Sequence, residues 1–398
     1  MGFSDLPFAV VPHPPGRRTR EETRVVAQRC VEDIVRLTCD ADARRSPDTA
    51  GPAAAPSRAL LVEAPDDAEE LDRFFMDRQW GDGLPVVAPT AARVERMLRG
   101  TRRAADEVVA NIAPSFAPAT VELIAINAAL AGCYPEHLPV LIAAVEAAVT
   151  PKFNGIRPTT HAAAVWLLIS GPAVKKLGVN GGGNCFGQGN WANAALGRAI
   201  RLILQNVGAL PGQLDYATQG QPGKYSFCCA ENISSGTWEP LHVERGYTSE
   251  RSTVTVVSAS SPVIMSTHAR DADDLIRVFA ATMAYPACND YVYGSEPWIV
   301  LCPEHAEILQ RAGLGKAEVK RRLWDQSRLA ASQLSAKDFE RTQNARRTEL
   351  GEITPDTLLP ISVSADAINV IVAGGPGTHS AYIPVFANSR SVTREILE

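Results

Sequence analysis

The stretch from Val179 to Gly208 reads VNGGGNCFGQGNWANAALGRAIRLILQNVG and joins a glycine-rich and asparagine-rich segment to an amphipathic helix pattern. Before it stands Ala162–Ser170 (AAAVWLLIS), an apolar run that fits a buried strand or part of a helix. Strand patterns follow at Lys224–Ala230 (KYSFCCA) and Arg251–Ser260 (RSTVTVVSAS). These strand–turn–helix passages, mixed with antiparallel-looking pieces, favour an α/β or α+β fold with a mixed sheet and flanking helices.

The rest of the chain divides into three regions. Residues 1–39 combine a short apolar strand pattern at Leu6–Pro14 with a helix pattern at Arg20–Leu37. Residues 40–65 are rich in Ala, Pro and Asp without apolar periodicity, which predicts a linker. Residues 66–398 form the main domain, with helices expected at 66–80, 90–98, 120–131, 272–285, 303–311 and 316–334, and strands at 262–266, 298–302 and 367–373.

The composition excludes several classes of protein. A net charge of −5, few aromatic residues and no long basic run lack the electrostatic footprint of a nucleic-acid binder. No window approaches the roughly 18–20 apolar residues of a membrane span. The N-terminus carries its basic residues after its apolar run, the wrong order for a secretory signal, so we expect a cytoplasmic protein. Eight cysteines in 398 residues are too dilute for a disulfide scaffold.

The glycine-rich segment formally contains a dinucleotide fingerprint, because Gly187-Gln-Gly189-Asn-Trp-Ala192 matches G-x-G-x-x-G/A. The fingerprint needs a strand directly before its first glycine, and this segment has none. We therefore expect a more general anion site built from backbone N–H groups at a helix start, with Asn190 or Asn193 able to cap. The expected ligand-binding residues here are Gly182, Gly183, Asn184, Gly187, Gly189 and Asn190.

Cys185 is the most distinctive residue of this segment. A thiol near a helix N-terminus has its thiolate stabilised by the helix dipole and by oriented N–H groups, which predicts a nucleophile. The competing interpretation is a buried cysteine that acts as a small hydrophobic residue. Candidate bases for the thiol are His161, in a loop upstream, and His379, in the GGPGTHS turn.

Further site candidates come from three places in the chain. Arg198 lies on the helix after the loop, where it either contacts an anion or forms structural salt bridges. Lys224 and Glu231 flank the KYSFCCA strand pattern, and polar residues at strand ends are common site groups, although Glu231 also fits the start of a turn. The turn Gly374–Ser380 offers a second nest of N–H groups, with Gly375 and Gly377 as ligand-binding candidates.

One short phrase occurs twice in similar form. CYPEHLPVL begins at Cys133 and CPEHAEIL begins at Cys302, each with Pro-Glu-His after a cysteine. An internal duplication explains the echo, and so does the common preference for proline and glutamate in the first turn of a helix.

Two parts of the chain resemble known sequences. Residues 2–38 (GFSDLPFAVVPHPPGRRTREETRVVAQRCVEDIVRLT) resemble the C-terminal end of the UGSC-like (seleno)protein family. The phrases AGCYPEHLPVLIAAVEA, PGKYSFCCAEN and VIVAGGPGTHSAYIP resemble the uncharacterised bacterial domain found with that family. The family's Sec/Cys-Gly-Ser-Cys redox motif is absent from this sequence, so the resemblance implies a C-terminal remnant. One hypothesis is that Met1 is an internal start downstream of a selenocysteine codon.

The resemblance implies thiol or redox chemistry by analogy with selenocysteine reductases, without naming a reaction. The leading hypothesis is a thiol-dependent redox or lyase-type enzyme that acts on a small anionic molecule. Its site would combine Cys185, His161 or His379, and Glu231. The alternatives are a metal-dependent hydrolase or lyase using the same residues, and a non-catalytic small-molecule-binding subunit of a selenoprotein-type redox system. The thiol-dependent enzyme and the binding subunit are both compatible with a redox partner protein or with a homo-oligomer. The sequence indicates no particular cofactor.

Overall fold

The structure is a computed structural model that describes residues 19–39, 58–153, 155, 159–208, 217–232 and 238–397. The chain forms two compact units, Met1–Ser57 and Arg58–Glu398. The strand expected at Leu6–Pro14 and most of the expected linker lie outside the described residues. The second unit begins at Arg58, earlier than the expected residue 66, because Arg58 and the Ala59 N–H both bind the Glu122 carboxylate.

The described part of the first unit is the helix α1 (Arg20–Cys39), as the apolar periodicity predicts. The Thr19 hydroxyl accepts a hydrogen bond from the Glu22 N–H, and the Glu22 carboxylate accepts one from the Thr19 N–H. This reciprocal arrangement is a capping box that fixes the helix start.

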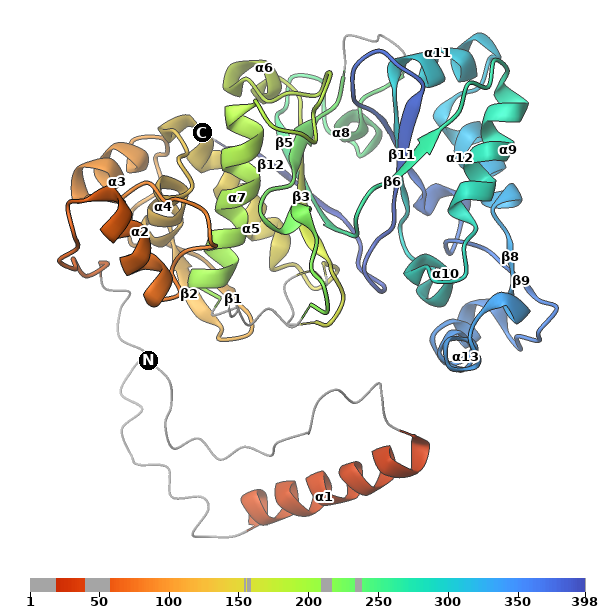
Figure 1. Ribbon diagram of the computed structural model, residues 1–398, viewed down its shortest axis with the longest axis horizontal. Helices are drawn as coiled ribbons and strands as arrows, with labels where there is room; N and C mark the ends of the chain where they lie inside the picture. The colour runs from red at the N-terminus through yellow and green to blue at the C-terminus, as the bar shows by residue number, and fades with distance from the viewer. Residues whose placement is uncertain are drawn as a thin grey trace. The chain divides into compact units, whose positions relative to one another are not determined.

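The second unit contains the remaining helices and strands (Figure 1). Its first half comprises α2 (Ala68–Asp77), α3 (Ala91–Leu98), β1 (Val108–Ile112), β2 (Ala117–Thr120), α4 (Val121–Leu130), α5 (Leu138–Ala148), β3 (Ala164–Ser170), α6 (Ala173–Leu177), α7 (Trp191–Asn206), β4 (Cys228–Ala230), α8 (Leu241–Glu244) and β5 (Thr253–Ala259). Its second half comprises β6 (Val263–Ser266), α9 (Ala272–Met283), α10 (Asn289–Tyr293), β7 (Trp298–Leu301), α11 (Pro303–Arg311), α12 (Lys316–Gln326), β8 (Leu329–Ala330), α13 (Ala336–Leu350), β9 (Leu358–Leu359), β10 (Asn369–Val372), β11 (His379–Ile383) and β12 (Val392–Glu395).

Among the described residues, the strands form two four-stranded mixed sheets and two small two-stranded ones. The first large sheet has the order β12-β5-β3-β4, and the second has the order β6-β11-β7-β10. Each contains one parallel pair, β3 with β4 or β7 with β10, followed by two antiparallel pairs. The α/β prediction with mixed strands and flanking helices is confirmed, although the single expected sheet is in fact two.

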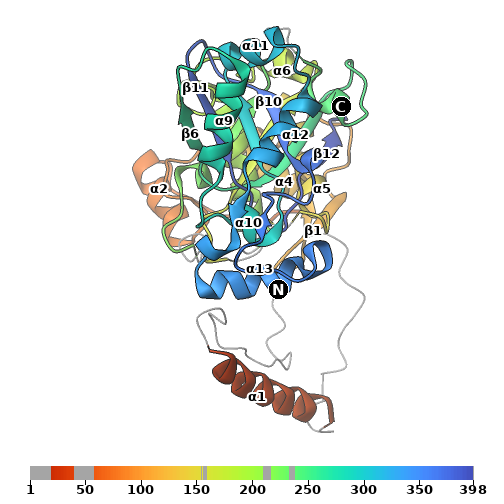
Figure 2. The same cartoon turned by 90° about the vertical axis from the view of Figure 1, so that its right-hand side faces the viewer.

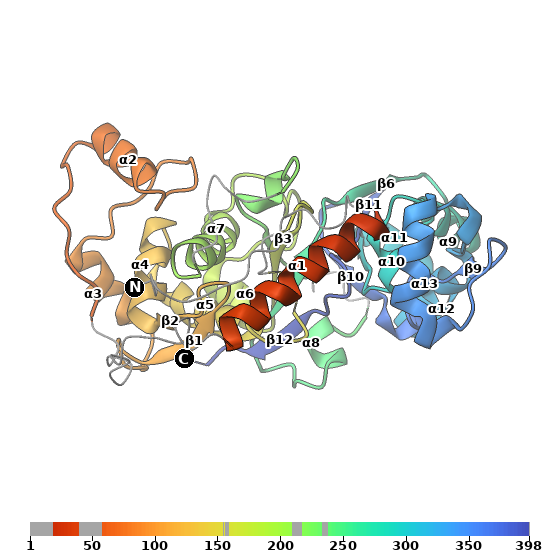
Figure 3. The same ribbon diagram turned by 90° about the horizontal axis from the view of Figure 1, so that it is seen from below.

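The two sheets stack face to face between outer layers of helices. Helices α5 and α7 cover the outer face of the first sheet, with α4 packed against them, and α9, α11 and α12 cover the outer face of the second (Figures 1 and 3). Alternate residues of β3 contact the two neighbouring layers. Leu167 packs toward the outer helices, whereas Trp166 and Leu168 face the second sheet. Side chains of successive strand residues point to opposite faces, so β3 is buried on both sides.

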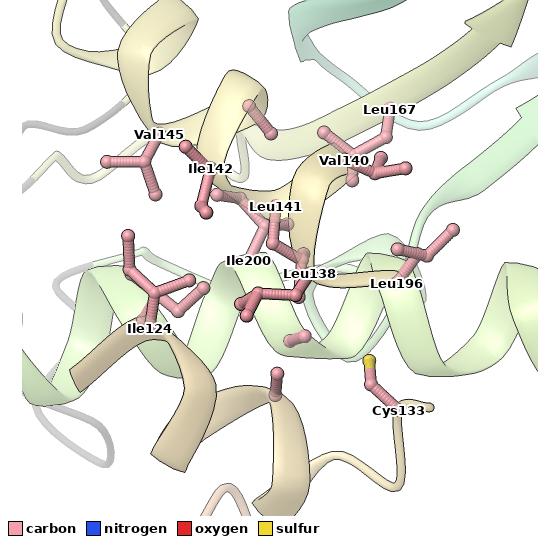
Figure 4. Packing of buried hydrophobic residues seen from close by; sticks show 14 of the residues in the cluster. Ile124, Cys133, Leu138, Val140, Leu141, Ile142, Val145, Leu167, Leu196 and Ile200 are labelled. Atoms are coloured by element: carbon pink, nitrogen blue, oxygen red, sulfur yellow. The ribbon is translucent and has the colours of Figure 1, made fainter. Parts of the chain in front are cut away.

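The apolar core of the first half lies under α5, whose sequence is hydrophobic on most faces. Leu138 and Leu141 are fully buried and lie beside Ile200 of α7, while Val140 lies beside Leu167 of β3 (Figure 4). A helix that is apolar all round is stable only when it is surrounded in this way.

The chain crosses between the sheets twice, at corresponding places. After β5 it passes to the edge strand β6 of the second sheet, and after β11 it passes back to the edge strand β12 of the first. The strand order and directions of the two halves therefore repeat. Trp166 of β3 and Trp298 of β7 occupy corresponding strands. Between the sheets their rings contact each other edge to face, with the ring centroids 5.1 Å apart.

The CYPEH and CPEH phrases do not follow this repeat. Pro135 begins a short 3-10 helix before β3, whereas Pro303 begins α11 after β7. The residue of the first half that corresponds to Pro303 is Pro172, which precedes α6 directly after β3. The echo is thus the common sequence of a helix start, and the repeat lies in the strands.

A buried acid lies in the second half, beside the crossing segment. Asp290 is fully buried, and its carboxylate accepts hydrogen bonds from the Tyr382 hydroxyl and, at 3.2 Å, from the Val385 N–H. The Cys288 sulfur lies 3.1 Å from the same Tyr382 oxygen. Burial raises the pKa of Asp290 to about 7. At the same end of the molecule, α10 packs against α13 (Figure 2).

Candidate functional site

The two glycine-rich segments meet in the structure. The Gly374 N–H donates a hydrogen bond to the Gly181 carbonyl at 2.8 Å, and Gly182 and Gly374 form an isolated β-bridge. A Cβ atom built on Gly375 would lie only 2.8 Å from Gly183 Cα. Glycine is needed here because two backbones touch, which is the close approach that its small size allows.

A third segment joins them from the end of β4. The Asn232 N–H donates to the Val372 carbonyl at 2.7 Å, and the Asn232 side-chain amide donates to the Gly374 carbonyl at 3.0 Å. Val372 ends β10 and Glu231 follows β4, so the carboxyl ends of the two parallel pairs converge. Ligands of α/β proteins bind at such ends. We call the place where residues 181–183, 231–232 and 374–375 meet the junction.

Cys185 lies beside the junction with its side chain in the apolar layer between the sheets. It is 4% exposed and belongs to the same cluster as Trp166, Phe227 and Cys229. The Cys229 thiol donates a hydrogen bond to the Cys185 sulfur, and this is the main reason why the pKa of Cys185 is lowered. The N–H groups of Cys185 and Phe186 lower the pKa further, against the effect of burial. The sequence analysis expects the dipole of α7 to lower the pKa of Cys185. In the structure, the main cause of the lowered pKa is the neighbouring Cys229 thiol.

Cys229 has the opposite electrostatic behaviour. It is fully buried on β4, and burial together with the hydrogen bond to Cys185 raises its pKa well above the ordinary value. The indole N–H of Trp166, which has no hydrogen-bond partner of ordinary geometry among the described atoms, acts on the Cys229 sulfur in the opposite direction. The pair therefore holds one proton on Cys229 and leaves Cys185 as the more acidic thiol.

Asn193 fixes the position of the loop that carries Cys185. Its side-chain nitrogen lies within hydrogen-bond distance of the carbonyl oxygens of Asn180 (2.9 Å), Cys185 (3.1 Å) and Cys228 (3.2 Å). Its side-chain oxygen accepts the Asn180 N–H at 2.8 Å. One buried amide thus joins the loop to β4. The other expected capping residue, Asn190, makes no side-chain capping bond.

Glu231 supplies a carboxyl group at the junction. It is 6% exposed, and burial raises its pKa, while the nearby Lys316 acts in the opposite direction. One carboxyl oxygen accepts the Leu241 N–H at 2.9 Å and the Ser170 hydroxyl at 3.4 Å. A raised pKa favours the protonated form of the carboxyl group, and exchange of that proton is what a general acid or base supplies.

Strand geometry relates this carboxyl group to the thiol pair. Cys229 faces the layer between the sheets, and Glu231 follows it by two positions along the same extended segment. Residues two apart in a strand share a face and are separated by about 7 Å. Glu231 therefore lies at the junction on the same side of β4 as Cys229.

His161 and Lys224 do not belong to the junction. They precede β3 and β4, whereas Glu231 follows β4, and the seven residues of β3 span about 20 Å. Burial lowers the pKa of His161, with a further contribution from Lys224, and the His161 ring lies 5.0 Å from that of Phe386. His161, expected to act as a base, and Lys224, expected to bind a ligand, thus lie near each other. They lie at the ends where β3 and β4 begin, away from the junction.

His379 lies beyond the other end of the glycine turn. It begins β11, pairs with Ser266 on the second sheet and is exposed. Gly377, expected to bind a ligand, donates its N–H to the Glu304 carboxylate at 2.7 Å instead. Of the candidates on this turn, Gly375 is the one that reaches the junction.

The neighbouring Ser380 binds a histidine that the sequence analysis does not single out. The Ser380 oxygen lies 2.8 Å from Nδ1 of His305 and accepts the Cys302 N–H at 3.1 Å. The other ring nitrogen of His305 lies 3.1 Å from the Thr267 carbonyl, which can only accept, so that nitrogen carries the proton. His305 is fully buried, and burial lowers its pKa and so favours the neutral ring. Its hydrogen bonds hold the glycine turn in place, which is a structural role.

The remaining ligand-binding candidates have structural partners. Arg198 forms an ion pair with Asp82 at 2.7 Å and also donates to backbone carbonyls of the neighbouring loop, as expected of a structural salt bridge. The Asn184 side chain donates to the Gln188 carbonyl at 2.8 Å and closes a turn. Gly187 has no room for a side chain against Asn184, and Gly189 has a φ of +102° that favours glycine.

The metal-dependent alternative has no supporting ligand set in the described ranges. No group of three His, Cys, Asp or Glu side chains lies close enough there to hold a metal ion. The described helices also include none that is long and apolar enough to cross a membrane.

No protein-family model matches this chain, and no curated protein matches it. The likeness to UGSC-like sequences therefore stays a resemblance. The residues that sequence reasoning missed are Cys229, Asn193 as a clamp and Lys316. The signal for Cys229 was the adjacent pair Cys228-Cys229, because neighbouring strand residues must face opposite sides.

Proposed function

We propose that the protein is a thiol-dependent enzyme that acts on a small anionic molecule at the junction, with Cys185 as the nucleophile. The observation that carries the proposal is the placement of Cys185 beside the buried Cys229 thiol, which lowers the pKa of Cys185. A thiolate is far more nucleophilic than a thiol, so a lowered pKa prepares Cys185 for attack.

The other groups have complementary roles in the proposal. The loop N–H groups of Cys185 and Phe186 stabilise negative charge at the sulfur. Glu231, whose pKa is raised by burial, exchanges a proton with the substrate or its leaving group. Preference for an anion follows from the density of backbone N–H groups between Gly181 and Asn190.

Alkylation of Cys185 tests the nucleophile. In a Cys30→Ser, Cys39→Ser background, which removes the cysteines of α1, the rate of modification by iodoacetamide is followed against pH by peptide mass spectrometry. We expect the midpoint of the Cys185 profile to lie below the value of about 8.5 for a free cysteine. A midpoint at or above that value would contradict the proposal.

Comparison of two reagents tests the preference for an anion. Iodoacetate and iodoacetamide differ in charge but react by the same displacement. We expect the ratio of their rates at Cys185 to favour iodoacetate relative to the ratio for free cysteine in the same buffer. An equal ratio would remove the anionic part of the proposal and leave the nucleophile.

A further inference from the structure

Two cysteine side chains from different segments belong to the same buried cluster between the sheets. Cys185 belongs to the loop before α7, and Cys229 belongs to β4. Asn193 binds the carbonyl oxygens of Cys185 and Cys228 with the same nitrogen, at 3.1 and 3.2 Å, so the loop backbone is held against the strand. The Cys229 thiol donates to the Cys185 sulfur. A disulfide between them requires the two Cβ atoms to come within about 3.5–4.5 Å of each other.

The two cysteines differ in access. Cys229 is fully buried, whereas the loop residues on either side of Cys185 are exposed, among them Asn184 and Phe186. Cys185, at 4% exposure against 0% for Cys229, is therefore the thiol that a reagent from solvent meets first. This order matches an attacking thiol followed by a resolving thiol.

We propose that Cys185 and Cys229 are a dithiol–disulfide couple and that the substrate class of this site is a small disulfide. The inference rests on the proposed function, because it uses Cys185 as the nucleophile. It adds the partner that completes the reaction and the class of bond that is attacked.

The reaction balances with the groups present. The Cys185 thiolate attacks one sulfur of the substrate disulfide, the substrate S–S bond breaks, and one thiolate leaves with the bonding electrons. The Cys229 thiol then attacks the Cys185 sulfur of the mixed disulfide and gives its proton to a departing thiolate. The protein dithiol is oxidised by two electrons, and the substrate disulfide is reduced to one thiol and one thiolate, which takes its proton from solvent.

Cys228 provides a matched control. It neighbours Cys229 in sequence and is equally part of β4, but it faces the outer helices. Burial raises its pKa, as it does for Cys133 on the same side of the sheet. The two cysteines of the KYSFCCA segment thus differ in the face of the strand that they occupy.

The test treats the Cys30→Ser, Cys39→Ser protein with oxidised glutathione, blocks remaining thiols with N-ethylmaleimide and maps the peptides by mass spectrometry. We expect a linked peptide pair containing Cys185 and Cys229 and release of two glutathione thiols per chain. In the Cys229→Ser variant, we expect the reaction to stop at a Cys185–glutathione mixed disulfide. The Cys228→Ser variant should still form the Cys185–Cys229 link.

The outcomes separate the inference from the proposed function. If the protein that retains Cys229 keeps a mixed disulfide at Cys185, the dithiol–disulfide couple is refuted, while Cys185 remains the nucleophile. No reaction at Cys185, together with an ordinary pH midpoint for its alkylation, would overturn both. Because the first of these results comes from a protein with both cysteines present, it does not depend on whether the Cys229→Ser variant folds.

Discussion

Replacement of Gly375 by alanine tests whether contact between the glycine segments builds the junction. The new Cβ would lie 2.8 Å from Gly183 Cα and 3.3 Å from Gly183 N. Carbon atoms pack at about 3.5–4.0 Å, so one backbone has to move by about 1 Å. Neither glycine has a positive φ, so the effect of alanine is purely one of space.

The cost follows from the contacts that the shift disturbs. Overpacking of this kind costs about 1–3 kcal/mol, and loss of the hydrogen bond from Gly374 to Gly181 adds about 1 kcal/mol. The control is Gly183→Ala, whose Cβ would lie 3.8 Å from Gly375 Cα in ordinary contact. We expect this control to stay within about 0.5 kcal/mol of the unsubstituted protein.

The assay is unfolding by guanidinium chloride, followed by tryptophan fluorescence, for the two variants and the unsubstituted protein. We expect Gly375→Ala to lower the free energy of unfolding by about 2–4 kcal/mol and to change the alkylation rate of Cys185, because the loop is displaced. Equal stability of the two variants would refute the reasoning, since it predicts a difference between two substitutions at one contact.

Three further predictions concern single residues. Asp290 has a folded-state pKa of about 7, so its contribution to stability is greatest below the unfolded pKa of about 3.9 and is lost as the pH rises through 7, a difference of about 4 kcal/mol. Asp290→Asn should flatten this pH dependence in unfolding curves measured from pH 4 to 8, and an unchanged slope would contradict the assignment. Arg198→Ala should cost about 3–5 kcal/mol, because it leaves Asp82 without its partner, while the pH midpoint of Cys185 alkylation stays unchanged; a shifted midpoint would point to a role in the site. Cys229→Ala should raise that midpoint relative to Cys229→Ser, which keeps a donor, and equal midpoints would show that the hydrogen bond is unimportant.

Local patterns predicted most elements but not their partners. The apolar run before the glycine loop is β3, and the helix pattern after the loop is α7, because burial and periodicity act within a few residues. The assignment of β5 and β6 to different sheets was not predictable, since only residues 260–262 separate them. Such a change of sheet depends on contacts with β11, which lies more than a hundred residues away in the chain.

The site was predictable in part for the same reason. Cys185, Glu231 and the two glycine segments were recognisable from local chemistry, and the structure brings them together around the junction. His161 and Lys224 were attractive for the same local reasons but lie at the opposite edge of the sheet. Only the parallel pairing of β3 and β4 decides which strand ends meet, and pairing direction is not encoded in either strand alone.

The exchange of edge strands has a consequence for synthesis of the chain. β5 pairs with β12, so Thr253 faces Glu395, which comes 142 positions later in the chain (395 − 253). During synthesis, β3, β4 and β5 therefore leave the ribosome long before β12, which completes the first sheet. In that interval the edge of β5 is uncovered, and an uncovered strand edge pairs readily with other chains. We therefore expect the incomplete chain to be prone to aggregation until β12 has been synthesised.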